Sequence, residues 1–179
     1  MTEEIVITGF GGQGVLSMGK ILAYSGLMQG LEVSWIPSYG PEIRGGTANA
    51  MVILSDSPIS SPILQDFDTA IILSQQAMDK FESRVKPGGL LLYTPSTIVR
   101  KPTRNDINIY AVPAIEEAAK INAPKVANMF LLGAYLKLRP ILEMEHVIEG
   151  IKHSVSERNW KFIPLNEQAI KAGMNLVEK

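Results

Sequence analysis

Residues 4–14 read EIVITGFGGQG and decide the fold, because they join a short apolar run to a glycine-rich turn. The run Ile5–Thr8 is β-branched and almost entirely apolar, which is typical of a strand covered on both faces. Apolar residues then recur at helical spacing from Val15 to Met28, and Gly30 supplies a stop. The stretch therefore predicts a buried strand, a glycine loop and a helix in direct succession.

A second strand and a long loop follow this helix. Residues 31–36 alternate apolar and polar side chains up to Pro37, so they complete a β–α–β unit with an expected right-handed crossover. Residues 38–46, SYGPEIRGG, contain too many glycines and prolines for a helix or strand and predict a nine-residue loop. The strand expected from Thr47 to Leu54 has no helix before it, so it should pair antiparallel with a neighbour.

The rest of the chain alternates strands and helices. Strands are expected at 70–73, 90–93 and 108–112, a turn at 86–89, and helices at 75–84, 114–121, 126–138, 142–155 and 164–176. No period of roughly 20 to 50 residues repeats, and no low-complexity linker divides the chain. We therefore predict a single domain over residues 1–179. Its expected class is α/β, with a Rossmann-like, doubly wound, mostly parallel sheet, flanking helices and a helical C-terminal third.

Composition excludes several classes of protein. The most apolar stretch, Val126–Leu136, is shorter than the roughly 20 residues of a membrane-spanning helix and contains Asn128. A net charge of −1 argues against a nucleic-acid-binding surface. The absence of cysteine excludes thiolate zinc sites, a cysteine nucleophile and cysteine-ligated iron–sulfur clusters within this chain. The N-terminus shows no signal-peptide pattern, so we expect a cytoplasmic protein without membrane or nucleic-acid partners.

The glycine loop has the chemistry of an anion site. Gly9, Gly11 and Gly14 stand where the strand must turn, where backbone must approach a ligand, and where helix meets strand. The helix N-terminus behind them presents unpaired N–H groups and about half a positive charge, which suits phosphate or carboxylate. The alternative is that these glycines serve only tight packing of strand against helix.

A nicotinamide-dinucleotide site would require more than this loop. It needs an acidic residue at the end of the second strand, roughly 20 residues further on, to bind the ribose hydroxyls. Residues 35–38 at that end contain no acid, and Glu32 stands at the start of the strand, where it should face away from the crevice. A free-standing dehydrogenase is therefore disfavoured, while a free-standing nucleotide-binding α/β enzyme stays an alternative.

The second loop carries further candidate residues. Arg44, Gly45 and Gly46 follow the second strand, so they should emerge near the same sheet edge as the glycine loop. A guanidinium beside bare backbone suits a phosphate, a carboxylate or the acidic side chain of a partner; the alternative is a surface arginine in a tight turn. Tyr39 and Glu42 are candidates for contact with substrate or partner, although such residues in turns are often only surface groups.

His146 and His153 lie seven residues apart on one predicted helix face, near Glu143 and Glu149. A di-metal site in a helical bundle needs such pairs on two helices, and no second Glu-x-x-His occurs. We therefore predict a solvated helix face and no metal site.

Residues 9–15, GFGGQGV, and 38–48, SYGPEIRGGTA, together resemble the gamma subunit of 2-oxoacid:ferredoxin oxidoreductases, in the pyruvate/ketoisovalerate oxidoreductase catalytic domain family. The resemblance extends to residues 16–35, 57–62, 86–89 and 128–129, and it is greatest to the 2-oxoglutarate branch.

This resemblance implies a component of an enzyme that oxidatively decarboxylates a 2-oxoacid to an acyl-CoA and passes the electrons to ferredoxin. Alpha and beta subunits would complete it, with thiamine diphosphate, Mg and a 4Fe-4S cluster in partner subunits, and with a ferredoxin-like delta subunit in some complexes. It implies coenzyme A handling at Gly11, Gly12, Gln13, Gly14 and Arg44, in loops that also hold Gly9, Gly45 and Gly46. The chain alone should be inactive and contain no catalytic residue. A purely structural assembly subunit is the alternative.

Overall fold

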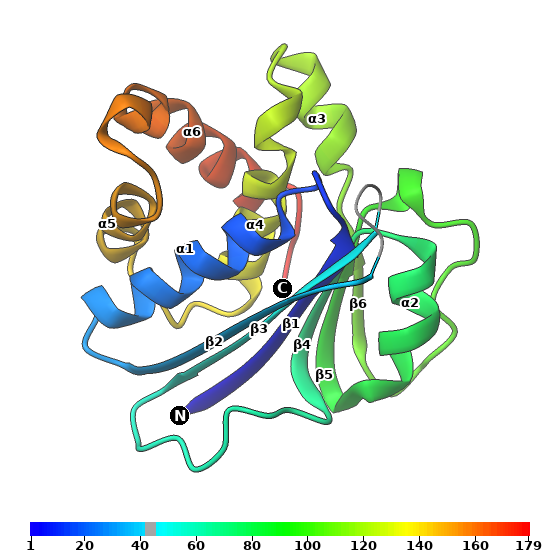
Figure 1. The fold of residues 1–179 in the computed structure, drawn as a ribbon. Coiled ribbons are helices and arrows are strands. Elements are labelled where there is room, and N and C mark those ends of the chain that lie inside the picture. The colour runs from blue at the N-terminus through cyan, green and yellow to red at the C-terminus, as the bar shows by residue number, and fades with distance from the viewer. Residues whose placement is uncertain (42–45) are drawn as a thin grey trace.

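Six strands form one sheet in the computed structural model, which describes residues 1–41 and 46–179 (Figure 1). The strands are β1 (Thr2–Phe10), β2 (Glu32–Tyr39), β3 (Thr47–Ser55), β4 (Phe67–Ile72), β5 (Val85–Tyr93) and β6 (Asn108–Ala111). The α-helices are α1 (Val15–Met28), α2 (Gln75–Phe81), α3 (Ala114–Lys120), α4 (Ala127–Leu138), α5 (Met144–Ser154) and α6 (Ile163–Met174). The C-terminal third is helical, as the sequence predicts.

The strand order is β2-β3-β1-β4-β5-β6, with β1 in the interior of the sheet. Strands β4, β5 and β6 follow β1 in parallel, whereas β3 runs antiparallel to both β1 and β2. The antiparallel pairing expected for Thr47–Leu54 is confirmed. Since β3 is antiparallel to both of its neighbours, β2 and β1 run in the same direction. Both strands therefore end at the same edge of the sheet, where the two glycine-containing loops begin.

Alternate residues of β1 face different apolar layers. Ile5 and Ile7 belong to a cluster built with the large helices, and Val6 belongs to a second cluster that contains Met78 and Phe81 of the α2 region. Figure 1 shows α1, α4, α5 and α6 on one face of the sheet and α2 on the other. A strand buried on both faces needs apolar side chains at every position, as the run Ile5–Ile7 provides. The predicted doubly wound α/β class is confirmed.

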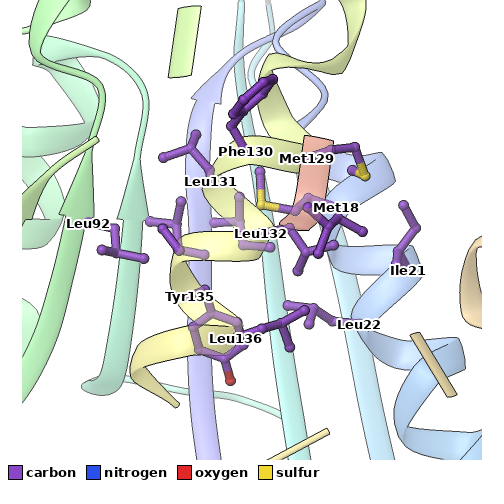
Figure 2. Close-up of a cluster of buried hydrophobic side chains, with 14 of the residues drawn as sticks. Met18, Ile21, Leu22, Leu92, Met129, Phe130, Leu131, Leu132, Tyr135 and Leu136 are labelled. Carbon is purple, nitrogen blue, oxygen red and sulfur yellow. The ribbon is translucent and has the colours of Figure 1, made fainter. Parts of the chain in front are cut away.

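Helix α4 forms the centre of the larger layer. Residues 128–136 are all buried, because the helix lies between the sheet, α1 and α6. Figure 2 shows its side chains meeting Met18 and Leu22 of α1 on one side and Leu92 of β5 on the other. A helix that is apolar on all sides belongs in a core. The helix predicted over 126–138 is therefore a core helix of the larger layer.

Helices α4 and α6 approach each other at two glycines. A Cβ atom added at Gly133 would overlap the backbone carbonyl of Ile170, and one added at Gly173 would overlap that of Phe130. The two helix backbones are therefore in direct contact, with no space for a side chain between them. This contact anchors α4 on α6 within the helical layer.

Several boundaries differ from the sequence predictions. Strand β1 spans Thr2–Phe10 and so includes Gly9 and Phe10, which the sequence pattern places in the glycine loop. Strand β2 continues through Pro37 to Tyr39, which shortens the predicted loop, because β2 is an edge strand and an edge strand tolerates a residue without N–H. Residues 86–89 lie inside β5, where the pairing register with β4 shifts and Gly88 has φ 77°. In the helix predicted over 75–84, the last three residues form a 3-10 turn instead of a further α-helical turn.

Glu3 is a buried acid at the opposite end of β1 from the glycine loop. Only 8% of the residue is exposed. Thr69 Oγ1 donates a hydrogen bond of 2.5 Å to its Oε1, and Arg139 Nε lies 3.5 Å from the same oxygen. Burial raises the pKa of Glu3 above its ordinary value of 4.5, against the hydrogen bond from Thr69 and the charge of Arg139, which lower it.

We expect Glu3→Gln to flatten the dependence of stability on pH. A raised pKa means that the folded state holds the Glu3 proton more tightly than the unfolded state does. The resulting stabilisation is complete below the unfolded pKa and is lost as the pH rises through the folded pKa. The free energy of unfolding of the variant, relative to the unmodified chain, should therefore rise between about pH 4 and pH 7 in urea titrations. Parallel profiles would contradict this, and Glu149→Gln is an exposed control.

Candidate functional site

The glycine loop connects the end of β1 to the start of α1 in four residues, 11–14. Gly12 has φ 91° and Gly14 has φ 77°, in the left-handed region that disfavours other residues. These two positions give the strand its sharp turn into the helix. The predicted succession of strand, glycine loop and helix is therefore confirmed, and its turn depends on glycine.

The side chain of Gln13 folds back beneath this loop. Its Oε1 accepts a hydrogen bond of 2.7 Å from the N–H of Phe10, and its Nε2 donates one of 3.1 Å to the carbonyl of Leu73. A Cβ at Gly9 would overlap the Gln13 amide. The structure thus places Gly9 and Gln13 where they shape the loop, with both ends of the Gln13 amide occupied by the chain itself.

The carbonyl of Gly14 is held by two donors. The N–H of Met18 donates a hydrogen bond of 3.0 Å within the first turn of α1, and Nδ2 of Asn128 on α4 donates one of 3.2 Å. A Cβ at Gly14 would overlap the Asn128 amide. From the sequence alone, Asn128 interrupts the apolar stretch 126–136 and belongs to the family resemblance, but no role follows from either. The available signal is a polar residue in an otherwise apolar helix.

Backbone donors remain at the open side of the loop. A helix leaves the N–H groups of its first turn without intrahelical acceptors, and the N-cap residue Gly14 has no side chain to bond them. The first turn of α1 contains no acidic residue, so no carboxylate of that turn offsets the positive end of the helix dipole. Gly12 is exposed, and a Cβ there would meet no atom within 4 Å. This geometry suits an anionic ligand.

The two loops meet through their described ends. The N–H of Gly11 donates a hydrogen bond of 2.9 Å to the carbonyl of Gly46, and the N–H of Gly40 donates one of 2.6 Å to Thr47. Ala48 pairs with Gly9 on one side and with Tyr39 on the other. Both loops therefore lie at one sheet edge. Glu42, Arg44 and Gly45 lie outside the described residues.

A pocket of about 290 Å³ lies between the glycine loop and the end of β2. Its lining includes Gly11, Gly12 and Gly14, the first turn of α1, and Tyr39, which is 74% exposed. A second pocket of the same volume shares Leu16, Ser17 and Tyr39 with it and continues along α1 to Lys20 and Trp35. Among the described residues, neither pocket is lined by an acidic side chain. An anion in either pocket therefore meets no carboxylate from the part of the chain that the structure describes.

The residues considered for other functions lie elsewhere. Glu32 stands level with Thr2 across β3, at the opposite sheet edge, as expected. His146 Nδ1 lies 3.2 Å from Gln29 Oε1, and the His153 ring stacks on Tyr24 with centroids 5.9 Å apart.

Over residues 1–41 and 46–179, no three metal-binding side chains gather, and no helix is long and apolar enough to cross a membrane.

Comparison with known sequences identifies relatives over nearly the whole chain. A family profile described as pyruvate ferredoxin/flavodoxin oxidoreductase matches residues 4–176. The 2-oxoglutarate synthase subunit KorC of Methanocaldococcus jannaschii is 37% identical over 87% of this chain and 84% of its own length. The ketoisovalerate oxidoreductase subunit VorA of Methanothermobacter thermautotrophicus is 36% identical over 95% of this chain. The chain spans only 35% and 37% of the lengths of the two VorA relatives that it matches.

Solved structures share the fold. The gamma subunit of keto/oxoacid ferredoxin oxidoreductase from Geobacter sulfurreducens superposes with a TM-score of 0.83 at 30% identity, covering 98% of this chain and 96% of that one. The 2-oxoglutarate:ferredoxin oxidoreductase of Magnetococcus marinus, solved with 2-oxoglutarate, coenzyme A and succinyl-CoA bound, has a TM-score of 0.87 at 23% identity over 98% of this chain and 31% of its own. The family match agrees with the resemblance in the two loops, and the chain belongs to the pyruvate ferredoxin/flavodoxin oxidoreductase family.

Proposed function

We propose that the chain is the gamma component of a multi-subunit 2-oxoacid:ferredoxin oxidoreductase, with 2-oxoglutarate as its substrate. The complex would oxidatively decarboxylate the 2-oxoacid to an acyl-CoA and reduce ferredoxin. The observation that carries this proposal is the match to the KorC subunit over 84% of that subunit's length. Alpha and beta subunits, and in some complexes a ferredoxin-like delta subunit, would supply the rest of the enzyme.

The role proposed for this chain is to hold an anionic part of coenzyme A at the glycine loop. Three features support it: backbone donors at the N-terminus of α1, the exposed backbone at Gly12, and two adjoining pockets whose described lining residues include no acid. Lys20 in the second pocket supplies a cation. Coenzyme A is also one of the three ligands named for the Magnetococcus marinus enzyme. A contribution from Arg44 stays a prediction from the sequence.

Thiamine diphosphate, Mg and the 4Fe-4S clusters are proposed to lie in the partner subunits. Iron–sulfur clusters take cysteine thiolates as ligands, and this sequence contains no cysteine. The groups of this chain that bear on the reaction are therefore its backbone donors and basic side chains, which would bind and orient a substrate. The single domain over residues 1–179 and the cytoplasmic location also stay predictions.

Reconstitution tests the proposed activity. The chain should be inactive alone, whereas co-expression with alpha and beta partners should give viologen reduction that requires both a 2-oxoacid and coenzyme A. In a panel of 2-oxoacids, 2-oxoglutarate should have the highest kcat/KM. Turnover by the pure isolated chain, or full coenzyme A-dependent turnover by the partners without it, would contradict the proposal.

Two substitutions separate coenzyme A binding from the alternatives. Arg44→Ala removes a charged donor, so it should raise the KM for coenzyme A about tenfold. Gly12→Ala places a side chain at φ 91° and should raise it by a similar factor. A purely structural subunit predicts weaker association in both variants with an unchanged KM. A free-standing nucleotide-binding enzyme predicts dinucleotide binding by the chain alone, which calorimetry measures directly.

A further inference from the structure

Asn128 is a buried amide in an apolar helix. Only 8% of the residue is exposed, and the eight residues that follow it on α4 are buried and apolar or glycine, apart from the hydroxyl of Tyr135. Burying an amide is costly unless it forms hydrogen bonds. Asn128 Nδ2 donates to the carbonyl of Gly14, 114 residues earlier in the chain. This hydrogen bond joins the helical layer to the glycine loop.

The bond acts on the peptide unit that begins the helix. Gly14 precedes α1 with φ 77° and ψ 20°, whereas a typical N-cap residue is extended and its side chain bonds the first turn. A peptide unit is planar, so fixing the carbonyl of Gly14 also fixes the direction of the N–H of Val15. With Met18 and Asn128 both donating to that carbonyl, the peptide plane cannot turn without loss of a hydrogen bond.

The opposite end of the loop is held in the same way. Gln13 Oε1 accepts from the N–H of Phe10, so a second carboxamide fixes the peptide unit at the end of β1. Between these two attachments, Gly11 and Gly12 have no side chains to restrict them. Helix α4 packs with its backbone directly on α6 at Gly133, so Asn128 projects from a helix that is itself anchored in the helical layer.

We infer that Asn128 is a positioning residue for coenzyme A binding: its amide holds the Gly14 carbonyl and thereby aims the first N–H groups of α1 at the ligand. This inference rests on the anion-binding role proposed for the loop. It extends the site to α4, which contributes no residue to the pocket beside the loop. Asn128 acts through the Gly14 carbonyl and does not touch the ligand itself. Its loss should therefore weaken coenzyme A binding and leave the chemical step unchanged.

Two variants of similar side-chain size test this inference in the reconstituted complex. Asn128→Leu removes the donor and keeps most of the packing, so the KM for coenzyme A should rise about fivefold to tenfold. Asn128→Asp also removes the donor and places a negative charge beside the α1 N-terminus, so the KM should rise further, by about thirtyfold. The kcat at saturating coenzyme A should stay within about twofold in both variants, since only binding is affected.

The matched control is Asn166→Leu. Asn166 Nδ2 donates to the carbonyl of Phe162, which precedes α6 as Gly14 precedes α1, but it lies away from the glycine loop. The same substitution there should leave the KM for coenzyme A unchanged. It removes a hydrogen bond of similar length, 3.1 Å against 3.2 Å, from an amide to a carbonyl at the start of a helix, although the Asn166 bond is local and exposed. It therefore accounts for the effect of replacing a helical asparagine with leucine.

Hydrogen–deuterium exchange of the full chain gives a readout that does not depend on turnover. In Asn128→Leu, exchange should accelerate about fivefold in peptides that cover residues 10–18, and stay unchanged in peptides from β5. Unchanged exchange in residues 10–18 would overturn the inference. The inference would also be overturned if Gly12→Ala raises the KM for coenzyme A while both Asn128 variants leave that KM unchanged. If none of these variants changes the KM, the coenzyme A role itself fails, while the exchange data still report whether Asn128 holds the loop.

Discussion

The Gly133→Ala variant is expected to unfold at a temperature roughly 10 °C below that of the unmodified chain. The added methyl group would overlap the carbonyl of Ile170, which belongs to the backbone of α6 and cannot rotate away. The helices would have to separate, which opens the interface around Phe130 and Ile170. Overpacking of this kind costs about 3 kcal/mol, and each kcal/mol lowers the Tm of a domain of this size by about 2–4 °C.

Thermal unfolding followed by circular dichroism measures this effect. Gln168→Ala on the exposed side of α6 is the control and should shift the Tm by less than about 2 °C. Gly173→Ala should act like Gly133→Ala, because its methyl group meets the carbonyl of Phe130 at the same interface. The variant with both substitutions should lower the Tm by less than the sum of the two single effects, since the first substitution already separates the helices. A Tm for Gly133→Ala close to that of the control would refute the close contact.

The Gly14→Ala variant is expected to raise the KM for coenzyme A about 100-fold in the reconstituted complex, more than Gly12→Ala. Both positions have positive φ, so both substitutions strain the backbone. Only at Gly14 does the new methyl group also overlap the Asn128 amide. The substitution therefore strains the turn and displaces the side chain that holds its carbonyl. Steady-state kinetics with varied coenzyme A gives the KM of both variants.

Gly30→Ala provides the matched control for this experiment. Gly30 lies just after α1 with φ 82°, and a Cβ there would meet no atom within 4 Å. Its substitution should lower stability by about 1 kcal/mol and leave the KM for coenzyme A unchanged. Equal KM values for Gly12→Ala and Gly14→Ala would show that the overlap with Asn128 has no effect on binding.

Local sequence patterns were sufficient to predict the first strand, loop and helix of the fold. The run Ile5–Thr8, the glycine loop and the helix ending before Gly30 were all predictable, because strand burial and helical period leave a repeating signature in neighbouring residues. Pro37 and residues 86–89 were not, since a proline or glycine breaks a strand or lies within it depending on the neighbouring strand. The edge position of β2 and the register shift beside β5 decide those two cases.

Part of the candidate site was likewise predictable from the sequence, and part was not. The spacing of Gly9, Gly11 and Gly14 was enough to predict a sharp turn ahead of a helix N-terminus, with the donors that an anion requires. It did not separate glycines that face a ligand from glycines that make room for the chain itself. In the structure Gly12 faces open space, whereas Gly9 accommodates Gln13 and Gly14 accommodates Asn128.

By itself, the sequence determined the α/β class, the position of the glycine loop and the family, because each is encoded in residues close together or in a motif of characteristic spacing. Only the tertiary structure decided that β3 lies between β1 and β2, that Gly11 bonds Gly46, and that Asn128 holds Gly14. The physical reason is distance along the chain. Contacts between residues up to 114 positions apart depend on how whole layers pack, and no local pattern records that packing.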